Sequence, residues 1–146
     1  MGQVSAIVLC WNELEIAKDT VRLLLKEGHE VILVDNGSTD GSKEFFKDVM
    51  DNNFKFVNLP KNMGASVGRN KGIEVSTGEN IFLIDGDILY VKGTIEVYQN
   101  ILRAYPDAGC VGQNSQKLLN ELGHNGVYDP TEADYRMSKD YSIEDW

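Results

Sequence analysis

Short apolar segments alternate with longer segments of helical periodicity along most of this chain. A continuous apolar run is typical of a parallel strand buried on both faces, whereas apolar residues three and four positions apart indicate a helix packed on one side. Gly28 is predicted to end the first helix, and Asp40 and Thr94 are predicted to cap the second and the last. The predicted strands are residues 4–9, 31–34, 54–57, 81–84 and 108–111, and the predicted helices are residues 14–25, 41–50, 64–75 and 95–102. This alternation predicts an α/β fold with a mostly parallel central sheet and helices on both faces.

The composition is that of one globular domain over residues 1–146, with 42% hydrophobic and 25% charged residues. Because the net charge is −9, we expect no binding to a nucleic acid backbone. Cys10 and Cys110 both lie in apolar runs, as is typical of reduced thiols in a cytosolic protein. No apolar run approaches the roughly 18 residues of a membrane span, and the first residues lack a signal-peptide or myristoylation pattern. We therefore expect a cytoplasmic location.

Polar residues gather where the predicted strands end. Sheets of this kind bind ligands at the carboxyl ends of their strands, so these residues are candidates for a single site. They are Trp11, Asn12 and Glu13 after the first strand, Asp35 and Asn36 after the second, Asn62, Gly64 and Arg69 after the third, and Asp85 and Asp87 after the fourth. The sequence therefore predicts a polar rim on an apolar sheet.

Asp85 and Asp87 flank Gly86 directly after the fourth predicted strand. In an extended chain residues i and i+2 point to the same side, so both carboxylates could meet at one point. A divalent cation would relieve their repulsion, and oxygen ligands suit Mg²⁺ or Mn²⁺. Because Mg²⁺ usually completes its ligand shell with substrate phosphates, the pair predicts a metal-bridged phosphate ligand. The alternative interpretation is a solvated turn.

Other rim residues suit a nucleotide. The Trp11 ring could stack on a base, an interaction of about 1–3 kcal/mol. Asp35 could accept a hydrogen bond from a ribose hydroxyl or a base N–H, or it could cap its own turn. Arg69 could bind phosphate or a base carbonyl, or it could be an ordinary surface residue. The chain has neither a G-x-G-x-x-G nor a G-K-[ST] pattern, which disfavours the dinucleotide and P-loop types of site.

Four ordered segments, VSAIVLCWNELE, VILVDNGSTDGS, NLPKNMGASVGRNKGI and GENIFLIDGDI, resemble the donor-binding, N-terminal portion of family-two inverting glycosyltransferases with the GT-A fold. The resemblance covers roughly residues 4 to 112. It implies a nucleotide-diphosphate sugar donor, favouring a UDP-sugar, and Mn²⁺ or Mg²⁺ as cofactor. The implied site residues are Asp85 and Asp87 for the metal, with Trp11, Asn12, Glu13, Asp35, Arg69 and Asp85 for the nucleotide sugar.

Residues 113–146 form an acidic segment for which the pattern specifies no structure. Members of the family usually continue into an acceptor-binding half, so we expect this chain to hold mainly the donor half. Glu144-Asp145 resembles the downstream Glu-Asp pair of the family, which implies that Asp145 is the catalytic base. The acceptor, whether saccharide, lipid or protein, stays open, as does a partner subunit or a membrane-associated complex that completes the site.

Three functions remain open from the sequence. The first is a metal-dependent glycosyltransferase that transfers a sugar to an acceptor hydroxyl with inversion. The second is a truncated donor-binding module with little or no transfer activity. The third is a different enzyme, either a nucleotidyltransferase or a dehalogenase-like phosphatase. The third is disfavoured because the loop after the first strand is not rich in Gly and Lys/Arg, and because Ile88 follows Asp87 where such a phosphatase needs Ser or Thr.

Overall fold

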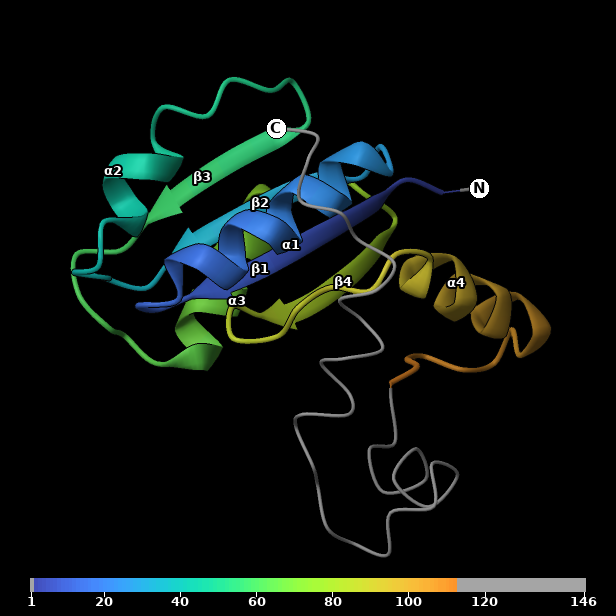
Figure 1. The fold of residues 1–146 in the computed structure, drawn as a ribbon. Coiled ribbons are helices and arrows are strands. Elements are labelled where there is room, and N and C mark those ends of the chain that lie inside the picture. Colours follow the sequence, from blue (N-terminus) through green and yellow to red (C-terminus); the bar gives the residue numbers. More distant parts are fainter. Residues whose placement is uncertain (1, 113–146) are drawn as a thin grey trace, which may run out of the picture. The chain divides into compact units, whose positions relative to one another are not determined.

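The computed structural model describes residues 2–112 of the chain (Figure 1). The chain divides into a first unit, residues 1–95, and a second unit, residues 96–146. Most of helix α4 (Thr94–Ala104) lies in the second unit, whereas the sheet and the candidate site lie in the first. Among the described residues, no helix has the length and apolar character needed to cross a membrane.

The first unit is built on a parallel sheet. Its strands are β1 (Val4–Cys10), β2 (Glu30–Asp35), β3 (Phe54–Asn58) and β4 (Asn80–Asp85), in the order β3-β2-β1-β4. Each neighbouring pair is parallel, so the carboxyl ends of these strands lie at one edge of the sheet. The predicted α/β fold with a mostly parallel sheet is confirmed.

Helices cover both faces of the sheet (Figure 1). Helices α1 (Leu14–Lys26) and α2 (Ser42–Phe46) pack on one face, and helix α3 (Ala65–Val75) packs on the other. Alternate residues of each strand supply the two halves of the core, because successive side chains point to opposite faces. The α1 half includes Ala6, Val8, Val31, Leu33, Ala17, Val21, Leu24 and Phe46, and the α3 half is Ile7, Ile32, Val34 and Leu59.

The residues that helix α3 buries against the sheet are Gly68 and Gly72. A Cβ atom added at Gly68 would lie 2.4 Å from Leu9 Cδ1, and one added at Gly72 would lie 2.4 Å from Ile7 Cγ2. A side chain at either position would require these β1 side chains to move, so the helix backbone packs directly against Leu9 and Ile7. This contact brings Arg69, the residue after Gly68, to the carboxyl end of the sheet.

Two predicted elements differ in the structure. Helix α2 ends at Phe46, where the Asp48 N–H bonds the Phe45 carbonyl and the Val49 N–H bonds the Phe46 carbonyl in tighter turns, and Met50 is 95% exposed. The strand predicted over residues 108–111 is wrong. Residues 108–110 are exposed and Val111 is partly buried, and the segment follows a turn in which the Ala108 N–H bonds the Tyr105 carbonyl at 2.9 Å.

A buried carboxylate fastens β4 to the amino-terminal ends of the other strands. Glu30 is only 4% exposed and accepts a hydrogen bond from the Ser5 hydroxyl. It also accepts hydrogen bonds from the N–H and the hydroxyl of Thr77, both at 2.8 Å. Lys55 Nζ lies 2.6 Å from Glu30 Oε1, and the Gly78 N–H donates to Ser5 Oγ at 2.7 Å. These bonds hold the segment that leads into β4 and therefore set where β4 begins.

The charged form of Glu30 is stabilised despite its burial. Burial alone would raise the pKa of Glu30, but the Lys55 ammonium and the hydrogen bonds from Ser5 and Thr77 outweigh burial and lower the pKa to about 2 from 4.5. Because the pKa of Glu30 is lower in the folded chain than in the unfolded chain, the ionised side chain stabilises the fold at pH values above the unfolded pKa. This contribution is lost as the pH falls through the folded pKa.

We predict that Glu30→Gln lowers the free energy of unfolding by about 3 kcal/mol at pH 7, since each pKa unit corresponds to about 1.4 kcal/mol. The difference in unfolding free energy between the wild type and Glu30→Gln should shrink as the pH falls from about 4.5 toward 2, because Glu30 of the wild type then becomes protonated and no longer stabilises the fold. Urea unfolding at pH 7 and pH 3 measures both quantities. Glu74→Gln, which removes an exposed carboxylate paired with Lys71, serves as the control. An equal Glu30→Gln loss at both pH values would refute this account.

Candidate functional site

The loops after β1 and β2 are bonded to each other at the carboxyl edge of the sheet. Asn12 has a left-handed backbone with φ 60°, its N–H donates to Ser38 Oγ at 2.9 Å, and its Oδ1 accepts from the Thr39 N–H at 2.7 Å. The carboxylate of Asp40 accepts from the Leu14 N–H at 2.9 Å, at the start of α1. The rim is therefore held by contacts between segments far apart in the sequence.

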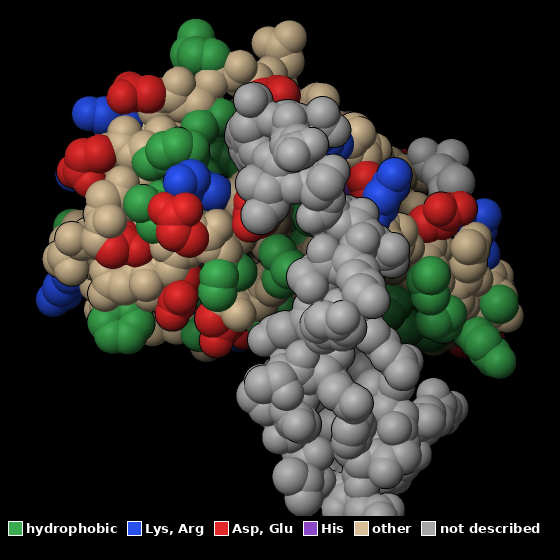
Figure 2. All heavy atoms as spheres, in the orientation of Figure 1, with side chains coloured by type: hydrophobic (Ala, Val, Ile, Leu, Met, Phe, Trp, Pro, Cys, Tyr) green, Lys and Arg blue, Asp and Glu red, His purple; other side chains and the backbone are tan. Residues whose placement is uncertain are grey.

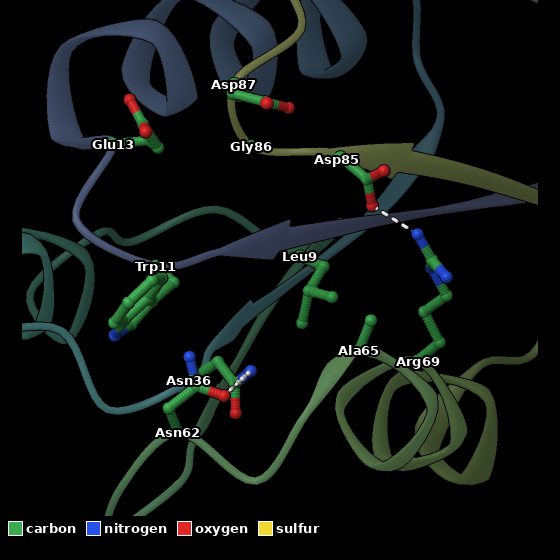
Figure 3. Close-up of a pocket in the computed structure, with 10 residues that line it drawn as sticks. All are labelled: Leu9, Trp11, Glu13, Asn36, Asn62, Ala65, Arg69, Asp85, Gly86 and Asp87. Atoms are coloured by element: carbon green, nitrogen blue, oxygen red, sulfur yellow. Dashed lines mark hydrogen bonds and ion pairs between the residues drawn. The ribbon is translucent and has the colours of Figure 1, made fainter.

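An open pocket of about 280 Å³ lies at this edge, at the low end of the size range of ligand sites. Figure 3 shows two sides of this pocket with the Leu9 side chain between them. The charged side carries Arg69, Asp85 and Asp87, and the other side, which we call the aromatic-amide side, carries Trp11, Asn36 and Asn62.

On the charged side, Arg69 Nη2 lies 2.5 Å from Asp85 Oδ1, and Figure 3 shows the two side chains directed at each other. Strand β4 ends at Asp85, and the next residues form a turn in which the Ile88 N–H bonds the Asp85 carbonyl at 3.1 Å. The extended geometry assumed for Asp85 and Asp87 therefore stops at Asp85. Both carboxylates still line the pocket, but only that of Asp85 pairs with Arg69.

Gly86 is required by a close contact between backbones. Its N–H donates to the Leu9 carbonyl at 2.7 Å, which continues the pairing of β4 with β1 past the end of the strand. A Cβ atom at this position would lie 2.8 Å from Leu9 O and 2.9 Å from Cys10 Cα. Glycine thus allows the chain between the two aspartates to press against β1, which fixes where Asp87 enters the pocket.

On the aromatic-amide side, two asparagines connect the loops after β2 and β3. Asn36 Nδ2 donates to Asn62 Oδ1 at 3.2 Å, and Asn36 Oδ1 accepts from the Met63 N–H at 2.9 Å. Asn62 Oδ1 also accepts from the Gly64 N–H at 2.9 Å. The sequence indicated that both residues belong to the rim, but it assigned them no role, because their pairing joins positions 26 residues apart.

The structure brings together most of the predicted site residues. Trp11, Glu13, Arg69, Asp85 and Asp87 line the pocket. Asn12 does not line it, since its side chain joins the two rim loops, and Asp145 lies outside the described residues.

Asp35 is fully buried at the end of β2 and does not line the pocket. Its Oδ1 accepts from the Ser38 N–H at 3.0 Å, whereas its Oδ2 has no hydrogen-bond partner among the described residues. The neighbouring Cys10 thiol is also buried, and burial raises its pKa. Because buried polar atoms are normally paired, the unpaired Oδ2 marks Asp35 as a position where a donor is missing.

The pocket carries a formal charge of −2, from the carboxylates of Glu13, Asp85 and Asp87 and the guanidinium of Arg69. On the face shown in Figure 2, Lys and Arg side chains are scattered singly among acidic ones. The described residues contain no group of three or more His, Cys, Asp or Glu side chains that could hold a metal ion by themselves. Two carboxylates do suit a cation that takes its other ligands from phosphate and water.

Comparison with known proteins identifies the family. Residues 5–138 match the family model for glycosyl transferase family 2. The chain is 36% identical over 108 residues to the cholesterol galactosyltransferase of Borreliella burgdorferi, covering 70% of this chain and 30% of that protein. It is 34% identical over 104 residues to the glycosyltransferase GlyG of Streptococcus pneumoniae, covering 67% of this chain and 35% of that protein.

The fold is similar to that of a solved structure, residues 1–349 of TarS from S. aureus. The TM-score is 0.58 at 22% sequence identity, and the match covers 76% of this chain and 38% of that one. The chain thus spans roughly a third of the length of the relatives it matches. Since the family model extends over most of the sequence, the chain belongs to glycosyl transferase family 2.

Proposed function

We propose that this chain binds a nucleotide-diphosphate sugar, favouring a UDP-sugar, together with Mn²⁺ or Mg²⁺, and takes part in transferring the sugar to an acceptor hydroxyl with inversion. The observation that carries the proposal is the division of one pocket into a charged side and an aromatic-amide side. A nucleotide has the same division, with a charged diphosphate at one end and a flat, hydrogen-bonding base at the other.

The nucleoside half of the donor is assigned to the aromatic-amide side. The Trp11 side chain is 52% exposed, so one face of its ring is available for stacking on a base. Asp35 Oδ2 is an acceptor without a partner among the described residues, and it suits a hydroxyl or N–H of the nucleoside, but because Asp35 is fully buried the proposed contact requires the loop after β2 to move.

The diphosphate half is assigned to the charged side. A diphosphate would be repelled by a pocket of charge −2, so it needs a cation that binds with it. Asp87 and Asp85 are the residues that would hold this cation. Arg69 already neutralises Asp85, which leaves Asp87 as the carboxylate of this pair without a cationic partner among the described residues. When bound, the divalent ion supplies positive charge that stabilises the diphosphate leaving group.

Transfer also requires a base. In the proposed reaction the acceptor oxygen forms a bond to the anomeric carbon, the bond from that carbon to the diphosphate oxygen breaks, and a carboxylate takes the hydroxyl proton. We assign this role to Asp145. The alternative is donor binding with little transfer, in which a partner subunit or a membrane-associated complex completes the acceptor site. The proposed acceptor is a saccharide, a lipid or a protein.

We predict that UDP and Mn²⁺ bind cooperatively, because each offsets the charge that disfavours the other. In calorimetric titrations, Mn²⁺ should lower the dissociation constant of UDP by about tenfold or more. Mn²⁺ alone should bind weakly, because one of the two carboxylates is paired with Arg69. Asp87→Asn should abolish most of this enhancement without changing thermal stability.

Asp19→Asn is the matched control, since it removes one exposed carboxylate on α1 outside the pocket. It should leave the Mn²⁺ enhancement unchanged. If UDP binds equally well with Mn²⁺ and with a chelator, in both the wild type and Asp87→Asn, then the two aspartates form a structural turn and the metal proposal is wrong.

The role of Asp145 separates transfer from donor binding alone. Loss of a positioned base typically slows a reaction by about 10²–10⁴-fold, so Asp145→Asn should reduce sugar transfer by that amount while UDP affinity stays unchanged. We expect slow turnover by this chain, measured as UDP release from a UDP-sugar with and without candidate acceptors. Turnover that survives Asp145→Asn would show that the base is another group, with Glu144 and Asp140 as the next variants.

A further inference from the structure

We propose that Asn62, held in place by Asn36, selects the base of the nucleotide by donating a hydrogen bond to a carbonyl oxygen on the base edge. The inference rests on the proposed function, because it concerns the same pocket. It makes nucleotides with a carbonyl at that edge, such as UDP, the preferred class over those with an amino group there, such as CDP.

The orientation of the two side-chain amides follows from their backbone partners. A backbone N–H can bond only to an acceptor, so the atom of Asn62 that faces the Gly64 N–H is its oxygen. By the same reasoning, the atom of Asn36 that faces the Met63 N–H is its oxygen. Neither amide can therefore rotate by half a turn without losing a hydrogen bond.

This arrangement leaves a donor facing the pocket. Asn62 Oδ1 accepts from both Asn36 Nδ2 and the Gly64 N–H, so its acceptor sites are occupied. Asn62 Nδ2 has no hydrogen-bond partner among the described residues, and Asn62 is exposed on the pocket wall. Asn36 is only 3% exposed, so the residue that holds Asn62 is itself fixed by the surrounding protein.

The donor lies on the side of the pocket where a base would bind. Figure 3 shows Asn62 and Trp11 on the same side, away from Asp85 and Arg69. A base stacked on Trp11 would have its diphosphate toward the charged side and its hydrogen-bonding edge near the amide pair. Pyrimidines differ at this edge, since uracil, like thymine, carries a carbonyl acceptor where cytosine carries an amino donor. An N–H donor on the protein favours the carbonyl and leaves an amino group unpaired.

The test compares UDP with CDP, each with Mn²⁺, by calorimetry on the wild type and on Asn62→Asp. The substitution keeps the oxygen that binds Gly64 and Asn36 and replaces the Nδ2 donor by a second oxygen. The added negative charge acts on both diphosphates alike, so the ratio of the two dissociation constants isolates the base. We expect the wild type to prefer UDP by about tenfold or more, and Asn62→Asp to remove or reverse this preference.

Two further variants keep the test decisive. Asn62→Ala removes the donor without adding charge and should bring the UDP-to-CDP ratio close to one, so it replaces Asn62→Asp if that variant does not fold. Asn52→Asp, an exposed site with no role in the pocket, should leave the ratio unchanged. An unchanged preference for UDP in folded Asn62→Asp or Asn62→Ala overturns this inference alone. Failure of the wild type to bind either nucleotide overturns the proposed function as well.

Discussion

The pocket depends on close packing against β1 at Gly68, Gly72 and Gly86. Gly68 and Gly72 let α3 rest on β1, and Gly86 lets the chain after β4 press against the same strand. Both contacts are made with β1. Packing against this strand therefore fixes the position of Arg69 on one side and of the two aspartates on the other. A side chain at Gly72 would press on the core residues Ile7 and Val34, whereas one at Gly86 would press on the β1 backbone beside the pocket.

The electrostatics of the pocket explain why a donor and a cation should bind together. The pocket is negative overall, and its guanidinium is already paired with Asp85. Neither a diphosphate nor a divalent cation alone finds a complete set of partners there, whereas the two together balance the charge. The aromatic-amide side is uncharged and fixed by hydrogen bonds to backbone groups. The proposed function therefore assigns recognition of the base and neutralisation of the phosphates to separate loops.

Much of the fold and part of the site follow from the sequence. Apolar runs and helical periodicity located β1, β2 and α1, because local burial leaves a local pattern. Asp35 was expected in the cleft, yet it follows Val31 and Leu33 on the α1 face of β2, and this face is known only once the register is known. The pairing of Asn36 with Asn62 and the turn that begins after Asp85 were also not predictable, since both depend on contacts between distant segments.

Paramagnetic relaxation by Mn²⁺ in an isotope-labelled sample with UDP tests the central claim most directly, because it measures the distance of each amide from the bound ion. The claim is that the ion binds with the nucleotide at the carboxyl edge of the sheet, beside Asp85 and Asp87. It predicts that broadening requires UDP and is strongest for the amides of residues 85–87 and 11–13, with little effect at the opposite edge around Gly28 and Gly78. Broadening at that opposite edge, or broadening that is independent of UDP, would contradict the account.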